Sequence, residues 1–112
     1  MDNNIEYDVE AEFKFNEDVN FFDGCRPIHL IEGNYTTGVH KYIEQSGNKA
    51  IGKIAFICPE AYPNSLWIGK EIEMYDGSRK IGVAIILKIY NKILEAWFFV
   101  LESCVIIIEI AS

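Results

Sequence analysis

The chain has 112 residues, 50% of them hydrophobic and 13% aromatic, so it can form one domain with a buried core and is not expected to be disordered. Its formal net charge of −7 is opposite in sign to the Lys and Arg excess of most nucleic-acid-binding domains. A charge of this sign favours cationic partners and disfavours binding driven by phosphate contacts.

The first predicted element is a β-strand over residues 5–15, where apolar and polar residues alternate without interruption. A period of two is typical of a strand with one buried and one exposed face. The buried face would carry Ile5, Tyr7, Val9, Ala11, Phe13 and Phe15, and the exposed face Glu6, Asp8, Glu10, Glu12 and Lys14.

Further short strands follow, each bounded by Gly, Pro, Asn or Ser. After a loop to Gly24, Pro27 opens a strand over Ile28–Ile31, because proline is tolerated at the start of a strand, and Gly33-Asn34 ends it. The others are predicted at Val39–Ile43, Lys53–Cys58, Leu66–Tyr75 and Lys80–Tyr90, with Asp76-Gly77 as a hairpin turn between the last two. These elements predict an all-β fold, a six- or seven-stranded antiparallel β-barrel, because closure removes exposed strand edges.

The C-terminal segment, residues 94–112, is an apolar extension to a barrel that covers about residues 5–93 of a single domain, 1–112. Three glutamates, Glu95, Glu102 and Glu109, disfavour a transmembrane span. Their spacing of seven residues would suit a helix, whereas the β-branched run at 105–108 favours a strand, which we prefer. Such a strand has to be covered by the barrel or by a second copy in a homodimer.

Charge is distributed unevenly along the chain. Residues 1–23 contain eight acidic side chains and Lys14, a net charge of −7, whereas residues 24–92 contain nine basic and six acidic side chains, a net charge of +3. We expect the acidic residues to form a face that attracts a basic protein, although an acidic surface can also serve solubility alone. The residues expected on this face are Glu6, Asp8, Glu10, Glu12, Glu17, Asp18 and Asp23.

The first residues lack the basic and apolar regions of a secretory signal, and we therefore expect a cytoplasmic protein that does not associate with membranes. Cys25, Cys58 and Cys104 are odd in number and widely spaced, which suits reduced thiols better than a disulfide framework.

Motifs that carry chemistry are weak in this chain. Residues 47–53 match the spacing of a phosphate-binding loop, but Ile54 stands where a magnesium-binding Ser or Thr is needed, and Pro59 follows too soon for the required helix. His29 and His40 lack the close spacing of zinc ligands, and no glycine elbow positions a serine nucleophile. We predict a protein without catalytic residues, cofactor or metal site.

A series of short motifs occurs in a recognisable order between residues 6 and 93: Phe22-Asp23-Gly24-Cys25-Arg26-Pro27, Thr37-Gly38, Pro59, and Leu66–Asp76 leading into Gly77-Ser78-Arg79-Lys80-Ile81-Gly82. This order resembles the C-terminal β-barrel domain of elongation factor Tu, here as a stand-alone domain. In that family the strand after the Arg-Pro motif and the glycine-rich hairpin lie near the T-stem of tRNA. The resemblance therefore implies RNA-facing positions at Arg26, His29, Arg79 and Lys80.

Two interpretations from different classes remain. The charge distribution favours a non-enzymatic, acidic inhibitor, such as an immunity protein of the contact-dependent-inhibition type that neutralises a basic ribonuclease toxin. The resemblance favours a translation accessory that binds tRNA or a partner of the elongation factor. We prefer the inhibitor, for which nucleic-acid binding is not expected.

Overall fold

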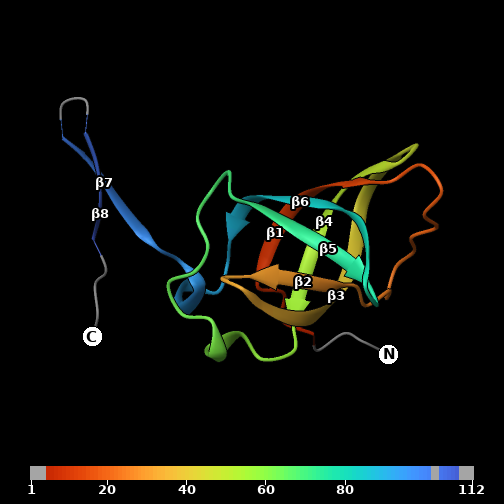
Figure 1. The fold of residues 1–112 in the computed structure, drawn as a ribbon, viewed down its shortest axis with the longest axis horizontal. Coiled ribbons are helices and arrows are strands. Elements are labelled where there is room, and N and C mark those ends of the chain that lie inside the picture. Colours follow the sequence, from red (N-terminus) through yellow and green to blue (C-terminus); the bar gives the residue numbers. More distant parts are fainter. Residues whose placement is uncertain (1–4, 102–103, 109–112) are drawn as a thin grey trace.

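The computed structural model describes residues 5–101 and 104–108 and is all-β. Six strands form a closed, antiparallel barrel in the order β1-β4-β3-β2-β5-β6, with β6 pairing again with β1 (Figure 1). The strands are β1 (Val9–Phe15), β2 (Ile28–Ile31), β3 (Asn34–Ser46), β4 (Lys49–Phe56), β5 (Glu71–Asp76) and β6 (Arg79–Ile89). The prediction of an antiparallel barrel is therefore confirmed, with six strands.

Alternation along β1 sets its buried face as predicted: Val9, Ala11, Phe13 and Phe15 are buried. They pack with inward residues of the other strands, including Ile54, Ile72, Met74 and Ile86, into one continuous core. Burying these side chains provides the main favourable contribution to folding, at roughly 25 cal/mol per Å² of apolar surface.

Some element boundaries differ from the predicted ones. The first strand begins at Val9, not Ile5, and the residue before it, Asp8, is buried. Leu66 joins only an isolated bridge to Glu95, and the strand expected over Leu66–Tyr75 is confined to β5. The stretch that resembled a phosphate-binding loop is instead the β3–β4 hairpin, with its turn at Gly47-Asn48.

Two inward glycines let neighbouring strands approach closely. A Cβ built on Gly82 would lie 2.3 Å from the Lys14 carbonyl oxygen, and one on Gly52 the same distance from that of Lys41. The second contact adjoins a register shift between Tyr42 and Glu44. These are backbone contacts, so a side chain could be fitted there only if the strands separated.

One side of the barrel is closed by the residues that follow β4 and β6 (left in Figure 1). They include two short 3-10 helices, η1 (Pro59–Ala61) and η2 (Lys92–Leu94). The backbone amides of Ser65 and Leu66 donate to the Leu94 carbonyl, and Ala96 donates to the Leu66 carbonyl. Both leucine side chains are fully buried. The residues that close the barrel therefore extend to Ala96.

Beyond that point, β7 (Trp97–Leu101) and β8 (Cys104–Ile108) pair with each other as an antiparallel hairpin. The prediction that residues 105–108 form a strand is confirmed. In the part of the chain described, the two strands form a separate sheet and do not extend the barrel (Figure 1). Glu102 and Glu109 lie outside the described residues.

Candidate functional site: the loop side of the barrel

The β1–β2 loop, residues 16–27, covers the side of the barrel opposite η2 (right in Figure 1). Its first part is held to β6, because Asn16 donates through its backbone amide to Ile81 and through its side chain to Lys80. Its last part runs along β3, where Gly24 N–H donates to the His40 carbonyl and His40 N–H donates to Cys25. A loop tied at both ends to the barrel presents its side chains in a fixed arrangement.

Two acidic residues add further links between this loop and the barrel. Asp23 accepts a hydrogen bond from the backbone amide of Tyr42, 2.8 Å away, at its Oδ1 atom. Asp18 pairs with Arg79 of the β5–β6 hairpin, at 2.7 Å to Oδ1. The side chains of this ion pair are exposed, so it adds at most about 1 kcal/mol to stability.

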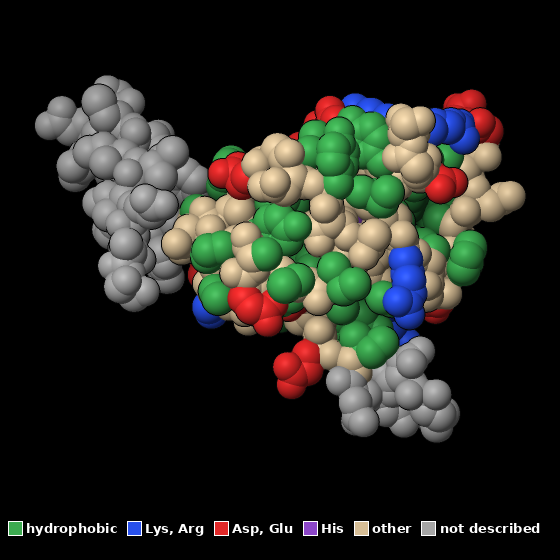
Figure 2. All heavy atoms as spheres, turned by 60° about the horizontal axis from the view of Figure 1, so that its bottom comes forward, with side chains coloured by type: hydrophobic (Ala, Val, Ile, Leu, Met, Phe, Trp, Pro, Cys, Tyr) green, Lys and Arg blue, Asp and Glu red, His purple; other side chains and the backbone are tan. Residues whose placement is uncertain are grey.

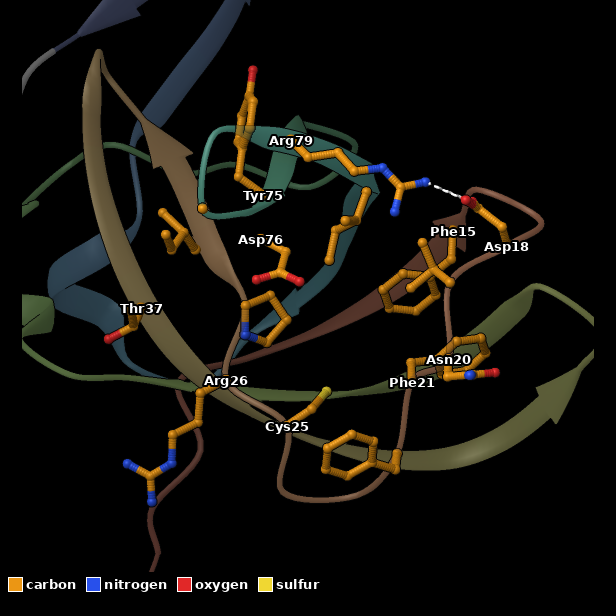
Figure 3. A pocket seen from close by; sticks show the side chains of 16 residues that line it. Phe15, Asp18, Asn20, Phe21, Cys25, Arg26, Thr37, Tyr75, Asp76 and Arg79 are labelled. Carbon is orange, nitrogen blue, oxygen red and sulfur yellow. Dashed lines mark hydrogen bonds and ion pairs between the residues drawn. The ribbon is translucent and has the colours of Figure 1, made fainter.

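A cavity of about 580 Å³ lies between this loop and the β5–β6 hairpin (Figure 3). Such a volume is within the range of small-ligand sites. Phe15 and Phe21 form an aromatic wall, with ring centroids 4.1 Å apart and nearly parallel planes. In Figure 3 the Asp76 carboxylate points toward the middle of the cavity, whereas the Arg26 guanidinium points away from it.

A second, open groove of about 530 Å³ lies on the outer side of the loop. It is flanked by Phe22 and Ile43, which are 63% and 56% exposed. Asp23 and Gln45 line the same groove, whereas the exposed Glu44 lines a separate hollow with Glu12 and Lys49. Large apolar side chains exposed next to acidic ones are the composition of a protein-docking surface. We call Phe22, Asp23 and Ile43 the docking surface.

Beneath the loop, a chain of buried polar side chains runs through the core. The Nε2 atoms of His29 and His40 are 2.8 Å apart, and His40 Nδ1 is 2.7 Å from the Tyr42 hydroxyl. That hydroxyl is 3.2 Å from the Cys25 thiol, and His29 Nδ1 is 3.3 Å from the Thr36 carbonyl oxygen. Both imidazoles are fully buried, so each nitrogen needs a partner, and each has one.

The Thr36 carbonyl at one end of this series determines which atom donates in each of its hydrogen bonds. A carbonyl only accepts, so His29 donates from Nδ1 and, being neutral, presents a bare Nε2 that accepts from His40 Nε2–H. Neutral His40 then accepts at Nδ1 from the Tyr42 hydroxyl, whose oxygen accepts from the Cys25 thiol. This set of donors and acceptors requires both histidines to be neutral.

Burial enforces that neutrality. Loss of hydration lowers the pKa of His29 to about 4, and the hydrogen bond to Thr36 only partly offsets it. The pKa of His40 is also far below its usual value, first through burial and then through the proximity of His29. Burial and then the hydrogen bond with Cys25 raise the pKa of the Tyr42 hydroxyl. The hydrogen-bonded series from Thr36 to Cys25 is therefore uncharged near neutral pH and has a structural role.

The residues predicted for the acidic face are not all on one surface. Glu6 is exposed, but Asp8 is buried, and its carboxylate accepts from the Phe56 amide and from Asn91 Nδ2. Glu10 is opposite Lys53 on β4 and Lys88 on β6, so basic neighbours balance its charge. The expectation that Asp8 faces a partner is therefore wrong.

The acidic residues of the β1–β2 loop are better placed for binding than those of β1. Glu12 is half-buried between Ile51 and Ile85, whereas Glu17, Asp18 and Asp23 are exposed. Figure 2 shows another face, with hydrophobic side chains scattered among polar atoms and acidic side chains lying mostly toward its edges. Near the docking surface the exposed acidic residues are therefore those of the loop, of which Asp18 is paired with Arg79 and Asp23 accepts from the Tyr42 amide.

The residues suggested as RNA-facing are also dispersed. His29 is inside the core and cannot contact RNA, which corrects that expectation. Arg79 is paired with Asp18, and Lys80 lies 3.4 Å from Glu73. Arg26 is exposed, and its side chain has no hydrogen bond or ion pair in the described part of the chain.

The exposure of Phe22 and Ile43 and the buried series of histidine hydrogen bonds were not predicted from the sequence. Both histidines fall on inward-facing positions, His29 with Ile31 and His40 with Tyr42, but the sequence of β2 is apolar on both faces and so gives little signal for His29. No group of three or more His, Cys, Asp or Glu side chains able to hold a metal ion occurs among residues 5–101 and 104–108. Cys25 and Cys58 are not in disulfide bonds.

No helix in the described ranges is both long enough and apolar enough to span a membrane. No protein-family model matches the chain, and no curated protein matches it.

Proposed function

We propose that this chain is a non-enzymatic binding protein that captures a basic protein at the loop side of its barrel, as an inhibitor of the immunity-protein type. The class of partner that we expect is a ribonuclease-type toxin. The observation that carries the proposal is the docking surface, where Phe22 and Ile43 are exposed beside Asp23 on a backbone fixed by the barrel.

Three physical effects favour binding at this surface. Exposed aromatic and aliphatic side chains act as anchors that become buried in a pocket of the partner, and such anchors dominate the binding energy of most interfaces. A loop already held by Gly24, Asp23 and Asn16 loses little conformational entropy on binding. The acidic residues steer a cationic partner and so raise the association rate.

The translation-accessory alternative has less support. Of the four positions that the resemblance to elongation factor Tu suggested, His29 is buried, and Arg79 and Lys80 are in ion pairs with acidic residues. Non-specific tRNA binding is driven by a net positive charge, whereas this protein has a formal net charge of −7.

The proposal is tested with the full chain, tagged and used to capture partners from the native cell, followed by mass spectrometry and purification of the captured protein. Phe22→Ala with Ile43→Ala should weaken binding of the purified partner at least about tenfold, which corresponds to the loss of one interface anchor. Ile57→Ala is the matched control, since Ile57 is 75% exposed and lines neither the cavity nor the groove.

The salt dependence of association supplies a second measurement. The association rate in stopped flow should fall as salt rises, and Glu17→Gln with Glu44→Gln should reduce both the rate and its salt dependence. A partner that is acidic, or that binds the double alanine variant with unchanged affinity, contradicts the proposal. Submicromolar binding of tRNA in a filter assay, lost in Arg79→Ala with Lys80→Ala, would favour the translation accessory.

A further inference from the structure

The cavity between the β1–β2 loop and the β5–β6 hairpin carries a second inference, because one of the two carboxylates in its lining, that of Asp76, has no partner among the described residues. Arg79 is committed to Asp18, whose two carboxylate oxygens both accept from the same guanidinium nitrogen. Asp76 lines the same cavity, and within the described residues its carboxylate has no hydrogen bond or ion pair. The Arg26 guanidinium points away from the cavity (Figure 3). Asp76 is exposed, and its carboxylate at the mouth of the cavity is therefore open to a cationic group from outside.

The wall around this charge is aromatic. Phe15 and Phe21 stack at a centroid distance of 4.1 Å. Tyr75 also lines the cavity, but in Figure 3 its ring points away from Asp76, and its hydroxyl donates to Glu73. Aromatic faces attract cations, most strongly where part of the hydration shell is removed. A carboxylate next to aromatic rings is therefore suited to a guanidinium or ammonium group on an alkyl stem, whose methylenes would contact the apolar wall.

We propose that this cavity receives an arginine or lysine side chain of the basic partner. The inference rests on the proposed function and deepens it, since it names the partner group that is recognised and the place where it binds. The docking surface contacts the partner around Phe22, and the cavity on the other side of the same loop holds the cationic side chain. Phe21 and Phe22 line both hollows, which are therefore adjacent.

The test uses the full chain and a probe with one cationic side chain and no charged termini, N-acetyl-arginine N-methylamide. Its control is the citrulline analogue, which has nearly the same shape but no charge. In NMR titrations the arginine probe should shift the signals of Phe21, Tyr75 and Asp76 and should bind at least roughly tenfold more tightly than the citrulline probe, because one charge-assisted contact distinguishes them.

Asp76→Asn should reduce binding of the arginine probe to the level of the citrulline probe. Glu60→Gln is the matched control, because Glu60 carries the same charge but lies in η1 and does not line the cavity. Equal binding of the two probes, or no effect of Asp76→Asn, overturns the inference. A circular dichroism spectrum and thermal midpoint close to those of the unmodified chain show that the variant is folded.

The two proposals fail separately. If the probe binds as expected but no basic protein is captured from the cell, the cationic site stands and the proposed function falls. If a basic partner depends on Phe22 and Ile43 but binds Asp76→Asn with unchanged affinity, the function stands and the cavity is not its cationic subsite.

Discussion

His29 on β2 and His40 on β3 face each other in the core with their Nε2 atoms 2.8 Å apart. One shared N–H joins them, so adding a second proton at this contact would place two N–H groups against each other. The pair contacts Phe13 and Phe56, which offer no polar group to stabilise a charge. The titratable groups near it are Tyr42 and Cys25, and Asp23 accepts from the backbone of Tyr42.

This arrangement predicts that the barrel loses stability in mild acid. His29 binds its proton near pH 6.5 in the unfolded chain but only near pH 4 in the folded one, and the pKa of His40 is lowered as well. Between these pH values the unfolded state carries more protons, so the free energy of unfolding falls as the pH falls, by up to about 1.4 kcal/mol per pH unit for each histidine.

Urea denaturation between pH 7 and pH 5 measures this slope. His29→Gln with His40→Gln removes both titrating groups, and this variant should show a clearly smaller loss of stability over the same range, whatever its stability at pH 7. A slope equal in both proteins would assign the acid sensitivity to other groups.

Asp8 should be important for stability, unlike the neighbouring Glu6. The Asp8 carboxylate accepts from the Phe56 amide at 2.8 Å and from Asn91 Nδ2 at 2.9 Å, and it thus joins the end of β4 to the residues after β6. Asp8→Ala leaves the buried Phe56 amide without its acceptor, which costs about 1–3 kcal/mol. Glu6→Ala changes an exposed residue and should stay within about 0.5 kcal/mol, as measured by denaturation.

The contrast between these two residues shows how far the sequence could predict the structure. Alternation placed Val9 to Phe15 correctly, because the side-chain period of a paired strand is two. It failed at Asp8, whose burial depends on a hydrogen bond to a residue 48 positions away. No local pattern contains that information.

The candidate site was harder to predict for the same reason. His29 and His40 meet only because the β2–β3 hairpin brings inward positions together, and the four residues of β2 are too few to establish a period. Phe22 was assigned to a loop, but its exposure follows from how residues 16–27 are tied to β3 and β6. The barrel could be predicted from the turns and alternation, whereas the site depends on tertiary contacts.

Gly82 provides a test of strand packing. A methyl group there would lie 2.3 Å from the Lys14 carbonyl oxygen and 2.9 Å from the Phe15 Cα, so β1 and β6 would have to separate. Gly82→Ala should lower the free energy of unfolding by about 1–3 kcal/mol or more. Gly33→Ala is the control: its Cβ meets nothing within 4 Å, and only the positive φ of 78° opposes it, so about 1 kcal/mol is expected. Equal losses in thermal or urea unfolding would contradict this account of the contact.

Truncation should distinguish the residues that close the barrel from the hairpin beyond them. A chain ending at Asn91 loses Leu94, which is fully buried, together with the carbonyl that accepts from Ser65 and Leu66. By analogy with large-to-small substitutions of buried leucine, at least about 2–5 kcal/mol of stability is lost, and aggregation is expected. A chain ending at Ala96 keeps these contacts and should retain the barrel.

The two truncated chains are compared with the full chain in secondary structure by circular dichroism, in stability by denaturation and in mass by light scattering. If the chain ending at Ala96 matches the full chain in stability and mass, β7 and β8 contribute nothing to folding or to a homodimer. If it becomes insoluble, or changes from dimer to monomer, the hairpin is a structural or dimer-forming element, as its apolar sequence predicts. Removing a fully buried leucine lowers the free energy of unfolding. Equal stability of the chain ending at Asn91 and the full chain would therefore contradict the role of Leu94 in closing the barrel.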